Sequence, residues 1–445
     1  MYKYNNNELQ EKWSGKNIPQ KLSINGIADS NIKRNLSVLM QNQQTQDISR
    51  SLNEDFGMGV GAPVGADQGI PHGGDGKAVF APISLALVRR TFPNLFANVL
   101  VGVQPLTGPV GLAYALRFIY KDIADPTKMV EAAWKAVSEY SGFSGSTAGT
   151  SGEKDAGTGV DTQSAETWKI TGDYFSEQVA NQFDTTGRGK IPELGLMFSR
   201  QSIVAKTRKL AASFSLESQH DIKTMQGVDM MAEMINVLQY EMTAEIDRET
   251  IGRCKSICKP IMCTSGDSND VDAGWVGRWS QERYSRIVGI IQKTANDIAT
   301  ATRRASANIA VVSPDMASVL QQAQPWFNRV TAEVNGSIAT PEIGTLNGNI
   351  KVYRDNQAVG LDGVDNGEVL LAYKGESVND CGIVFCPYVT GVINQAIDPN
   401  DFSPRVGVMS RYAFANNMLG ADNYYRLLKF DTKDIWLSGE DGYKF

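Results

Sequence analysis

The strongest periodic pattern of hydrophobic positions lies in mid-chain, between Val228 and Lys259. Its apolar residues recur at spacings of three and four, which predicts one buried face of an α-helix: Met231, Met234, Ile235, Leu238, Met242 and Ile246. Asp229 is placed to cap the start of this helix, and Glu233 suits the positive end of its dipole. A long rod with one apolar side is expected to support the other elements of the fold.

The other side of this helix is more polar and is expected to face one surface of the molecule. Its positions are Asn236, Tyr240, Thr243, Asp247 and Thr250. Just upstream, the pattern from Leu216 to Gln226 predicts a shorter helix. Gly227 can adopt the left-handed conformation that ends it.

Further upstream, large apolar residues alternate with mostly small or charged ones, which predicts a long β-strand with one apolar face. That face carries Val110, Leu112, Tyr114, Leu116, Phe118 and Tyr120. A second extended segment is predicted from Ser202 to Leu216. The two strands would form a protruding two-stranded arm, and the Gly-, Ser- and Thr-rich segment from Asp122 to Pro192 would be an insertion at its tip.

Downstream of the long helix, the patterns predict a compact α/β block over roughly residues 270 to 395. It contains an amphipathic helix from Ser280 and a second helix that begins at Ser313 and Pro314. Residues 258–272 are predicted to be a loop. The predicted strands are 308–312, 350–354, 368–373 and 383–387, with further strand material at 406–409 and 424–428.

The first 54 residues differ in charge from the rest of the chain. They carry seven Lys and Arg against five Asp and Glu, whereas the remaining residues carry 36 against 44. Within this polar leader, Ile32, Leu36 and Leu39 share a helical face after a possible cap at Asp29 or Ser30. The leader is therefore predicted to contain one amphipathic helix.

The segment from Asp55 to Lys77 contains eight glycines and two prolines. It cannot bury enough apolar surface to offset the conformational entropy that ordering would cost. Such a segment is either a flexible linker or an arm that becomes ordered only against another subunit. We interpret the segment as such an arm.

Composition excludes several classes of protein. The 445 residues carry a net charge of −6, which argues against a dedicated nucleic-acid binder. Five cysteines are too few for a disulfide framework in a chain of this length, so reduced thiols and folding in the cytoplasm are expected. The N-terminus is polar, and the longest uncharged run, Thr91 to Leu116, is broken by prolines and polar residues. A soluble protein with no membrane partner is predicted.

The candidate chemical motifs are weak. Cys254 and Cys258 lie one helical turn apart and Cys263 is near, but structural zinc sites usually have four ligands in paired short spacings. These thiols are interpreted as core residues. Neither His72 nor His220 has the companion motif of a hydrolase or a metalloprotease. No catalytic, cofactor-binding or metal-binding residue is predicted, and the chain is not expected to be an enzyme.

Nine short segments resemble the major capsid protein of the T-even-type tailed phages. In chain order they are Phe80–Ile83, Val88–Arg90, Pro93–Leu95, Gly102–Pro109, Glu241–Glu249, Gly277–Trp279, Cys386–Val389, Ala396–Pro399 and Ser410–Tyr412. Each segment is weak alone, but nine in the same order as in the family are specific.

This resemblance implies an α+β fold, the tailed-phage capsid fold of the Hong Kong 97 type. The implied parts are a cleavable leader (1–54), an N-terminal arm with the first helix (55–97), an extended E-loop (98–215) with an insertion at about 122–192, the spine helix of a peripheral domain (216–265), an axial domain (266–398) and C-terminal strands of the peripheral domain (399–445).

The resemblance also implies the function of a major capsid protein that self-assembles, as hexameric capsomers, into the icosahedral or prolate head of a tailed double-stranded DNA phage. The protein would be made and assembled in the host cytoplasm and reside in the virion. Implied partners are further copies of itself, the prohead protease, the scaffold, portal, vertex and decoration proteins, and packaged DNA through non-specific phosphate contacts.

Proteolytic maturation is a further implication of the resemblance. The family's precursor is cut after a Leu/Ile-x-Glu sequence, and Leu52-Asn53-Glu54 matches it immediately before the Gly-rich segment. The implied processing residues are therefore Leu52, Glu54 and Asp55. Leu9-Gln10-Glu11 fits the same short pattern, and position before the Gly-rich segment favours the later match.

Two related alternatives stay open. A pentamer-forming vertex paralogue would have a similar sequence, and copy number in the virion would distinguish it. A non-viral, encapsulin-like shell protein would share the fold but would need no cleaved leader. A soluble enzyme, by contrast, would be a monomer or small oligomer with a ligand pocket.

Overall fold

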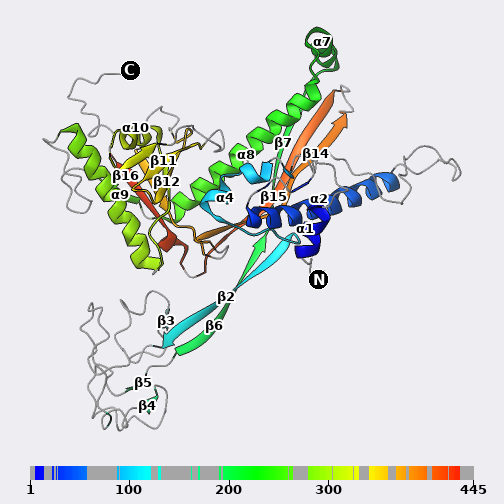
Figure 1. The fold of residues 1–445 in the computed structure, drawn as a ribbon. Helices are drawn as coiled ribbons and strands as arrows, with labels where there is room; N and C mark the ends of the chain where they lie inside the picture. The colour runs from blue at the N-terminus through cyan, green and yellow to red at the C-terminus, as the bar shows by residue number, and fades with distance from the viewer. Residues whose placement is uncertain are drawn as a thin grey trace.

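The computed structural model describes the body of the chain and most of its N-terminal part (Figure 1). Most of the predicted insertion at 122–192, most of the Gly-rich segment 55–77 and most of residues 81–90 lie outside the described residues. The described residues are 6–14, 23–24, 27, 29–57, 88–89, 91–121, 129–131, 162, 169–170, 190–191, 194–258, 260–263, 279–302, 304–323, 325–329, 340–358, 367–376, 380–397, 403–418 and 420–430.

The long predicted helix is confirmed as α8 (Met230–Ile257), which runs from α7 to the compact α/β domain in Figure 1. Asp229 caps its start, because its side-chain Oδ1 accepts a hydrogen bond from the Met231 N–H at 3.1 Å. The preceding helix α7 (Leu216–Gln226) ends at Gly227, whose φ of 68° lies in the left-handed region. The predicted start of α8 at Asp229 and the predicted end of α7 at Gly227 are therefore both confirmed.

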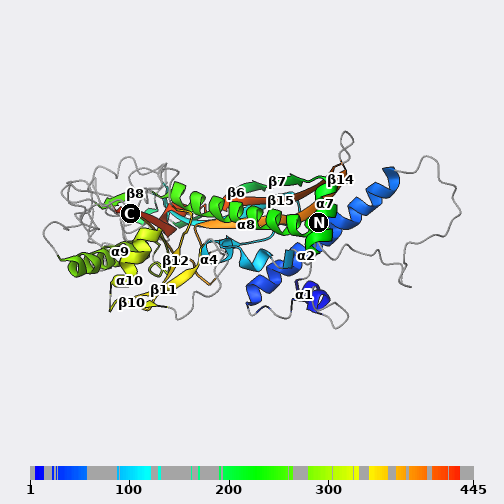
Figure 2. The same cartoon turned by 90° about the horizontal axis from the view of Figure 1, so that it is seen from above.

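One face of α8 packs on a four-stranded sheet in the order β1-β14-β15-β7. Its strands are β1 (Gly102–Val103), β14 (Ile383–Ile397), β15 (Pro404–Asn416) and β7 (Lys206–Ser213). β14 is longer than the predicted strand at 383–387 and forms an antiparallel pair with β15 along almost its whole length. In both views α8 lies along β15 (Figures 1 and 2).

The compact α/β block is confirmed and contains a seven-stranded sheet in the order β10-β11-β12-β9-β13-β16-β8. In chain order its strands are β8 (Pro260–Cys263), β9 (Ile309–Val312), β10 (Phe327–Arg329), β11 (Glu342–Leu346), β12 (Ile350–Arg354), β13 (Glu368–Ala372) and β16 (Tyr425–Phe430). β9 and β12 are parallel neighbours, and β13 joins β9 to the C-terminal strand β16.

Two predicted helices accompany this sheet. α9 (Ser280–Thr302) packs on β16 and on the 3-10 turn η3 (Ala421–Tyr424), and α10 (Pro314–Gln322) packs on α9. The predicted loop at 258–272 is partly wrong, because β8 forms inside it and pairs in parallel with β16. Its partner lies far along the chain, so local pattern could not indicate this strand.

The two-stranded arm is confirmed, but its second strand lies earlier in the sequence than predicted. β2 (Val110–Lys121) pairs antiparallel with β6 (Leu194–Val204), and the pair projects away from the body in Figure 1. The predicted segment from Ser202 to Leu216 divides at Ala205, and its later part, β7, pairs with β15 instead. The Ala205 N–H donates to the Pro109 carbonyl at 2.9 Å, where the arm meets the body. Shorter strands beyond the pair are β3 (Met129–Glu131), β4 (Lys169–Ile170) and β5 (Lys190–Ile191).

In its described residues the leader forms α1 (Asn6–Ser14) and most of α2 (Ser30–Gly57). The predicted amphipathic face of α2 is confirmed, because Leu36 and Leu39 are fully buried and Ile32 packs against the same core. α1 was not predicted, since its sequence is almost entirely polar. η1 (Phe92–Asn94) and α4 (Ala97–Leu100) lie between the leader and the two-stranded β2–β6 arm in the sequence. Residues of both belong to the same hydrophobic core.

The predicted apolar stripe of α8 is confirmed, but its predicted polar side is only partly exposed. Asn236 and Tyr240 are exposed as expected, whereas Asp247 and Thr250 are buried. The reason is that the later turns of α8 are also covered by the segment around α4. There the Asp247 Oδ1 accepts a hydrogen bond from the Phe96 N–H at 2.9 Å. The prediction for these two positions was therefore wrong.

Replacement of Asp247 by Ala is expected to lower the free energy of unfolding by about 1–3 kcal/mol, because the buried Phe96 N–H would lose its acceptor. Urea unfolding of the unassembled subunit measures this loss. Glu241 is the matched control, since it is an exposed acid on the same helix. Glu241→Ala should change stability by less than about 0.5 kcal/mol. Equal losses in the two variants would contradict the assignment.

Candidate assembly and processing surfaces

The arm presents an apolar face that the described part of the chain leaves exposed. In the β2–β6 register Val110 lies opposite Val204, and Tyr114 lies opposite Arg200. Directly opposite residues share one face of an antiparallel pair. On this face Leu112 is 56% exposed and Tyr114 is 69% exposed, and Phe198, further along β6, is 76% exposed. The predicted apolar side of the strand is thus confirmed for Val110, Leu112 and Tyr114, and it points away from the protein's own core.

The opposite face of the arm is the one that attaches it to the body. Ile203 is buried in a small cluster with Cys386, Ala413 and Ala415. These partners come from β14 and β15, so the base of the arm lies against the four-stranded sheet. The β2–β6 pair therefore contacts the sheet through one of its faces, and its larger apolar residues lie on the other face, where they are exposed.

The predicted processing residues lie in the last turns of the leader helix. Leu52, Glu54 and Asp55 all fall within α2, which continues to Gly57. The Gly-rich segment that follows, from residue 58, lies outside the described residues. A protease binds its substrate as an extended strand, so cutting here would require these helical turns to unwind.

The leader helix is held on the body by two buried asparagines as well as by its apolar face. The Asn35 Nδ2 donates to the Val103 carbonyl at 3.0 Å. The Asn42 Nδ2 donates to the carbonyls of Leu106 (2.8 Å) and Tyr388 (3.0 Å). Sequence reasoning assigned only the apolar positions and missed both amides. Their spacing of seven residues, on the side of Leu39, was the signal that could have found them.

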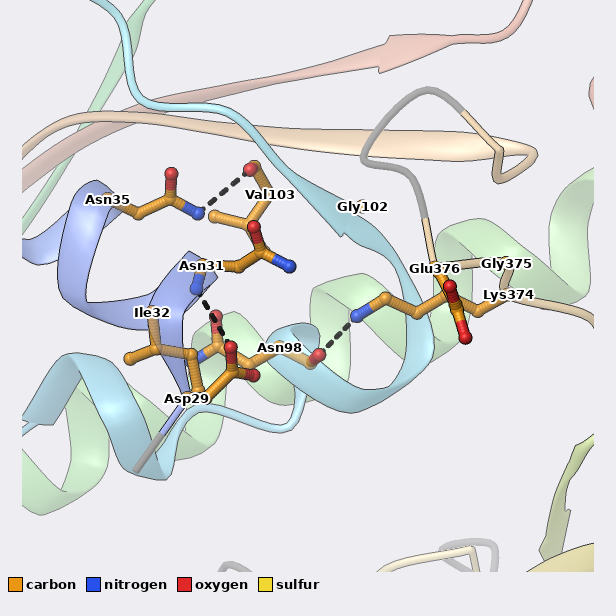
Figure 3. A pocket seen from close by; sticks show the side chains of 10 residues that line it. All are labelled: Asp29, Asn31, Ile32, Asn35, Asn98, Gly102, Val103, Lys374, Gly375 and Glu376. Carbon is orange, nitrogen blue, oxygen red and sulfur yellow. Dashed lines mark hydrogen bonds between the residues drawn. The ribbon is translucent and has the colours of Figure 1, made fainter. Parts of the chain in front are cut away.

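A cavity of about 490 Å³ lies between the leader and the body (Figure 3). Its lining comes from the start of α2, from α4, from β1 and from the loop after β13: Asp29, Asn31, Ile32, Asn35, Asn98, Gly102, Val103, Lys374, Gly375 and Glu376. The Lys374 Nζ donates to the Asn98 carbonyl, and burial lowers the pKa of Lys374. The lining holds no nucleophile with an adjacent base, so the cavity does not have the constellation of a hydrolase or a transferase.

Ionic clusters join α8 to both sheets. On the four-stranded sheet, Glu249 accepts hydrogen bonds from Arg208 of β7 (2.6 Å) and from the Tyr412 hydroxyl of β15 (2.6 Å). On the seven-stranded side, Arg248 pairs with the buried Asp355 at 2.7 Å. Charge pairs of this kind hold the helix in register on each sheet.

The interpretation of Cys254, Cys258 and Cys263 as core residues is confirmed, and Cys381 and Cys386 are buried as well. The five thiols, at positions 254, 258, 263, 381 and 386, form no disulfide, and all are buried. Burial raises the pKa of Cys381 to about 11 and that of Cys386 to about 12, so neither thiol ionises near neutral pH. Within the described residues no group of three or more His, Cys, Asp and Glu could hold a metal ion.

The two histidines named in the sequence analysis, and one further charged residue, are placed as follows. His220 is exposed on α7, whereas His72 lies outside the described residues. Arg304 follows α9 and pairs with Asp380 at 2.6 Å, so it has a structural role there. No described helix has the length and apolar character needed to cross a membrane.

In this chain the described polar clusters join its own elements, and the projecting β2–β6 arm presents exposed apolar side chains. These features are typical of the class of structural subunits. Comparison with known proteins agrees. The major capsid protein of Serratia phage KSP90 is 28% identical over 401 residues, which cover 86% of this chain and 85% of the relative. That of Enterobacteria phage T4 is 25% identical over 424 residues, 80% of either chain.

Residues 77–441 match the family described as major capsid protein Gp23, and the chain belongs to this family. It is therefore a major capsid protein of a tailed phage of the myovirus type, a structural component of the virion head and not an enzyme. Family membership and the observed elements confirm the predicted α+β capsid fold. Among solved structures, the capsid of Myoviridae phage XM1 aligns with 74% of this chain and 90% of its own at a TM-score of 0.39 and 11% identity.

The Glu249 cluster predicts a specific loss of stability in acid. Burial alone would raise the pKa of Glu249, but the hydrogen bonds from Tyr412, Arg208 and Arg253 outweigh it and lower the pKa below the usual 4.5. A depressed carboxyl pKa stabilises the folded state above the unfolded-state value, and this contribution is lost as pH falls through the folded-state value. Glu249→Gln should therefore be less stable than the wild type at pH 7, and the difference should shrink below about pH 4.5.

Urea midpoints of the unassembled subunit at pH 7 and at lower pH measure this effect. Glu245→Gln is the control, because Glu245 binds the same Arg208 at 2.9 Å but its side chain is 45% exposed. Exposed pairs contribute little. A pH-independent difference between Glu249→Gln and the wild type would contradict the assignment.

Proposed function

We propose that this major capsid protein self-assembles as hexameric capsomers into the icosahedral or prolate head of a double-stranded DNA phage. The observation that carries the proposal is the exposed apolar face of the β2–β6 arm. Apolar patches of this kind on a projecting element are typical of protein–protein contacts, because burial removes them from water. Neighbouring copies of the chain would cover the face.

The domain assignment is part of this proposal. Residues 1–54 would be the leader, 55–97 the N-terminal arm and first helix, 98–215 the E-loop, 216–265 the spine of the peripheral domain, 266–398 the axial domain and 399–445 the returning strands. The contacts of α8 with both sheets support its assignment as the spine, since each sheet has its own ionic contact to the helix. The sheets cross the proposed boundaries, because β14 lies in the four-stranded sheet with β15 and β7, whereas β16 lies in the seven-stranded sheet.

The proposed partners act on different parts of the chain and of the assembled shell. A prohead protease would cut the leader after Glu54, and the scaffold, portal, vertex and decoration proteins would contact the assembled shell. Packaged DNA would meet the inner surface through non-specific phosphate contacts. Synthesis and assembly would take place in the host cytoplasm. The relatives named as major capsid proteins favour this role over the vertex paralogue and over a cellular shell.

Assembly is expected to depend on the apolar face of the arm. The double replacement Leu112→Ser and Phe198→Ser should leave the circular dichroism of the unassembled subunit unchanged, because both side chains are exposed. It should raise the protein concentration needed for assembly at least about tenfold, because burial of each side chain contributes about 1.5–3 kcal/mol. Sedimentation and electron microscopy of the purified protein measure particle formation.

Ser202→Ala is the matched control for this experiment. Ser202 is exposed on the same face, directly opposite Leu112, and its replacement removes no apolar surface. The control should assemble as the wild type does. Normal particles from the double variant would contradict the role of the arm, and a wild type that sediments only as small species would contradict the proposed function as a whole.

Maturation predicts a mature N-terminus at Asp55. Mass spectrometry of particles formed with the prohead protease should detect this terminus, and Glu54→Gln should leave the leader attached because the protease would lose the acid it recognises. Glu11→Gln is the control, since Leu9-Gln10-Glu11 fits the same short pattern. Its particles should be cut as in the wild type. An intact Met1 in mature wild-type heads would contradict cleavage.

A further inference from the structure

The antiparallel pair of β14 and β15 is interrupted at one place along its length. Its register shifts twice between Pro387 and Val392, so Thr390 and Gly391 have no residue opposite them in this ladder. Gly391 has a φ of 79°, in the left-handed region that glycine adopts readily. Such a bulge bends the strand and takes its residues out of the regular pairing. We call residues 387–392 the β14 bulge.

A cavity of about 20 Å³ lies between the β14 bulge and α8. About 10–15 Å³ is enough space for one water molecule. The lining residues come from the segment around η1, from α8, from the β14 bulge and from β15: Thr91, Leu95, Gln239, Met242, Thr243, Ile246, Thr390, Gly391, Val408 and Ser410. None of them carries a charge, so the cavity suits one small, neutral and polar molecule rather than an ion.

The hydroxyl of Thr390 is the group in this cavity that needs a partner. Thr390 is 6% exposed, and its Oγ1 has no hydrogen-bond partner within the described part of the chain. A buried hydroxyl without a partner is costly, because the hydrogen bond that it makes to water in the unfolded chain is lost. Ordered water is the usual partner of buried polar groups that the protein itself does not satisfy.

Two further hydroxyls in the lining can bind the same molecule. The Ser410 Oγ accepts a hydrogen bond from the Gly391 N–H at 3.4 Å, which is long compared with the usual distance of about 2.9 Å, and this hydroxyl can also donate. The Thr243 Oγ1 donates to the Gln239 carbonyl at 2.9 Å, and its lone pairs can accept. With Thr390 the cavity offers three polar partners, within the two to four that a buried water needs.

We propose that this cavity is the binding site of one structural water molecule, which joins the β14 bulge to α8. Thr390 on β14, Ser410 on β15 and Thr243 on α8 are its ligands. The water gives α8 a neutral polar contact to the four-stranded sheet, closer to the start of the helix than the ionic contacts of Glu249. The site belongs to the single subunit, so it does not depend on the proposed assembly.

Crystallography of the purified full chain, at a resolution that shows ordered water, is the direct test. Density for one water is expected in the cavity, at about 2.7–2.8 Å from the Thr390 Oγ1. Thr390→Ser should keep this density, because serine retains the hydroxyl. A structure of the wild type that shows other buried waters but no density at this site would overturn the proposal.

The variant Thr390→Val gives an independent test, because a wet and a dry cavity predict opposite signs. Valine has nearly the shape of threonine but no hydroxyl. If water is bound, the variant loses a hydrogen bond, and the equilibrium constant of unfolding should rise about 2- to 10-fold. If the cavity is dry, the variant removes an unsatisfied group, and the constant should fall. Urea unfolding of the unassembled subunit measures the change.

Thr207→Val is the matched control, because Thr207 is an exposed threonine on β7 of the same sheet. This variant makes the same chemical change and should alter the constant less than about twofold. A Thr390→Val subunit that is more stable than the wild type, or that changes no more than Thr207→Val, would overturn the proposal. If Thr390→Val fails to fold, the wild-type structure alone decides the outcome.

Discussion

The structure depends on the burial of one helix, α8, against two different sheets. Its apolar stripe lies on β15 and β7 of the four-stranded sheet, and its last turns reach β16 of the seven-stranded sheet. Apolar burial is not directional and would allow the helix to slide or rotate. The pairs Glu249–Arg208 and Arg248–Asp355 supply the missing register, one on each sheet. Because the partners of the helix, Arg208 of β7 and Asp355 directly after β12, belong to different sheets, α8 also sets how the sheets lie relative to each other.

Structural features that depend on residues close together in the chain could be predicted from the sequence. The caps at Asp229 and Gly227 and the stripe of α8 follow from spacing within a few residues, and all are confirmed. Errors occurred where a distant partner decides the outcome. The segment at 202–216 has one extended pattern but two partner strands, and the switch at Ala205 depends on a contact with Pro109. Asp247 looked like a surface residue because the segment that covers it lies more than a hundred residues upstream.

The leader shows a second limit of sequence patterns, which concerns buried polar groups. A polar residue on a helix is normally assigned to the solvent side, and Asn35 and Asn42 were missed for that reason. Both side chains are buried, and the carbonyls of Val103 and Leu106 accept their hydrogen bonds. Only the position of these carbonyls makes an amide favourable there, and they belong to residues far from the leader in sequence. The apolar positions of α2 could be predicted, whereas its specificity could not.

The β2–β6 arm and the leader rely on different kinds of contact: apolar side chains in the arm, and hydrogen-bonding amides in the leader. The arm presents apolar side chains such as Leu112 and Phe198, whose burial depends mainly on area and tolerates small changes of geometry. Such a surface can accept a partner that meets it at slightly different angles. The leader instead binds through amides that require one register. A chain with both can hold its leader in a single position while its arm remains adaptable, and this difference follows from the chemistry of the two surfaces alone.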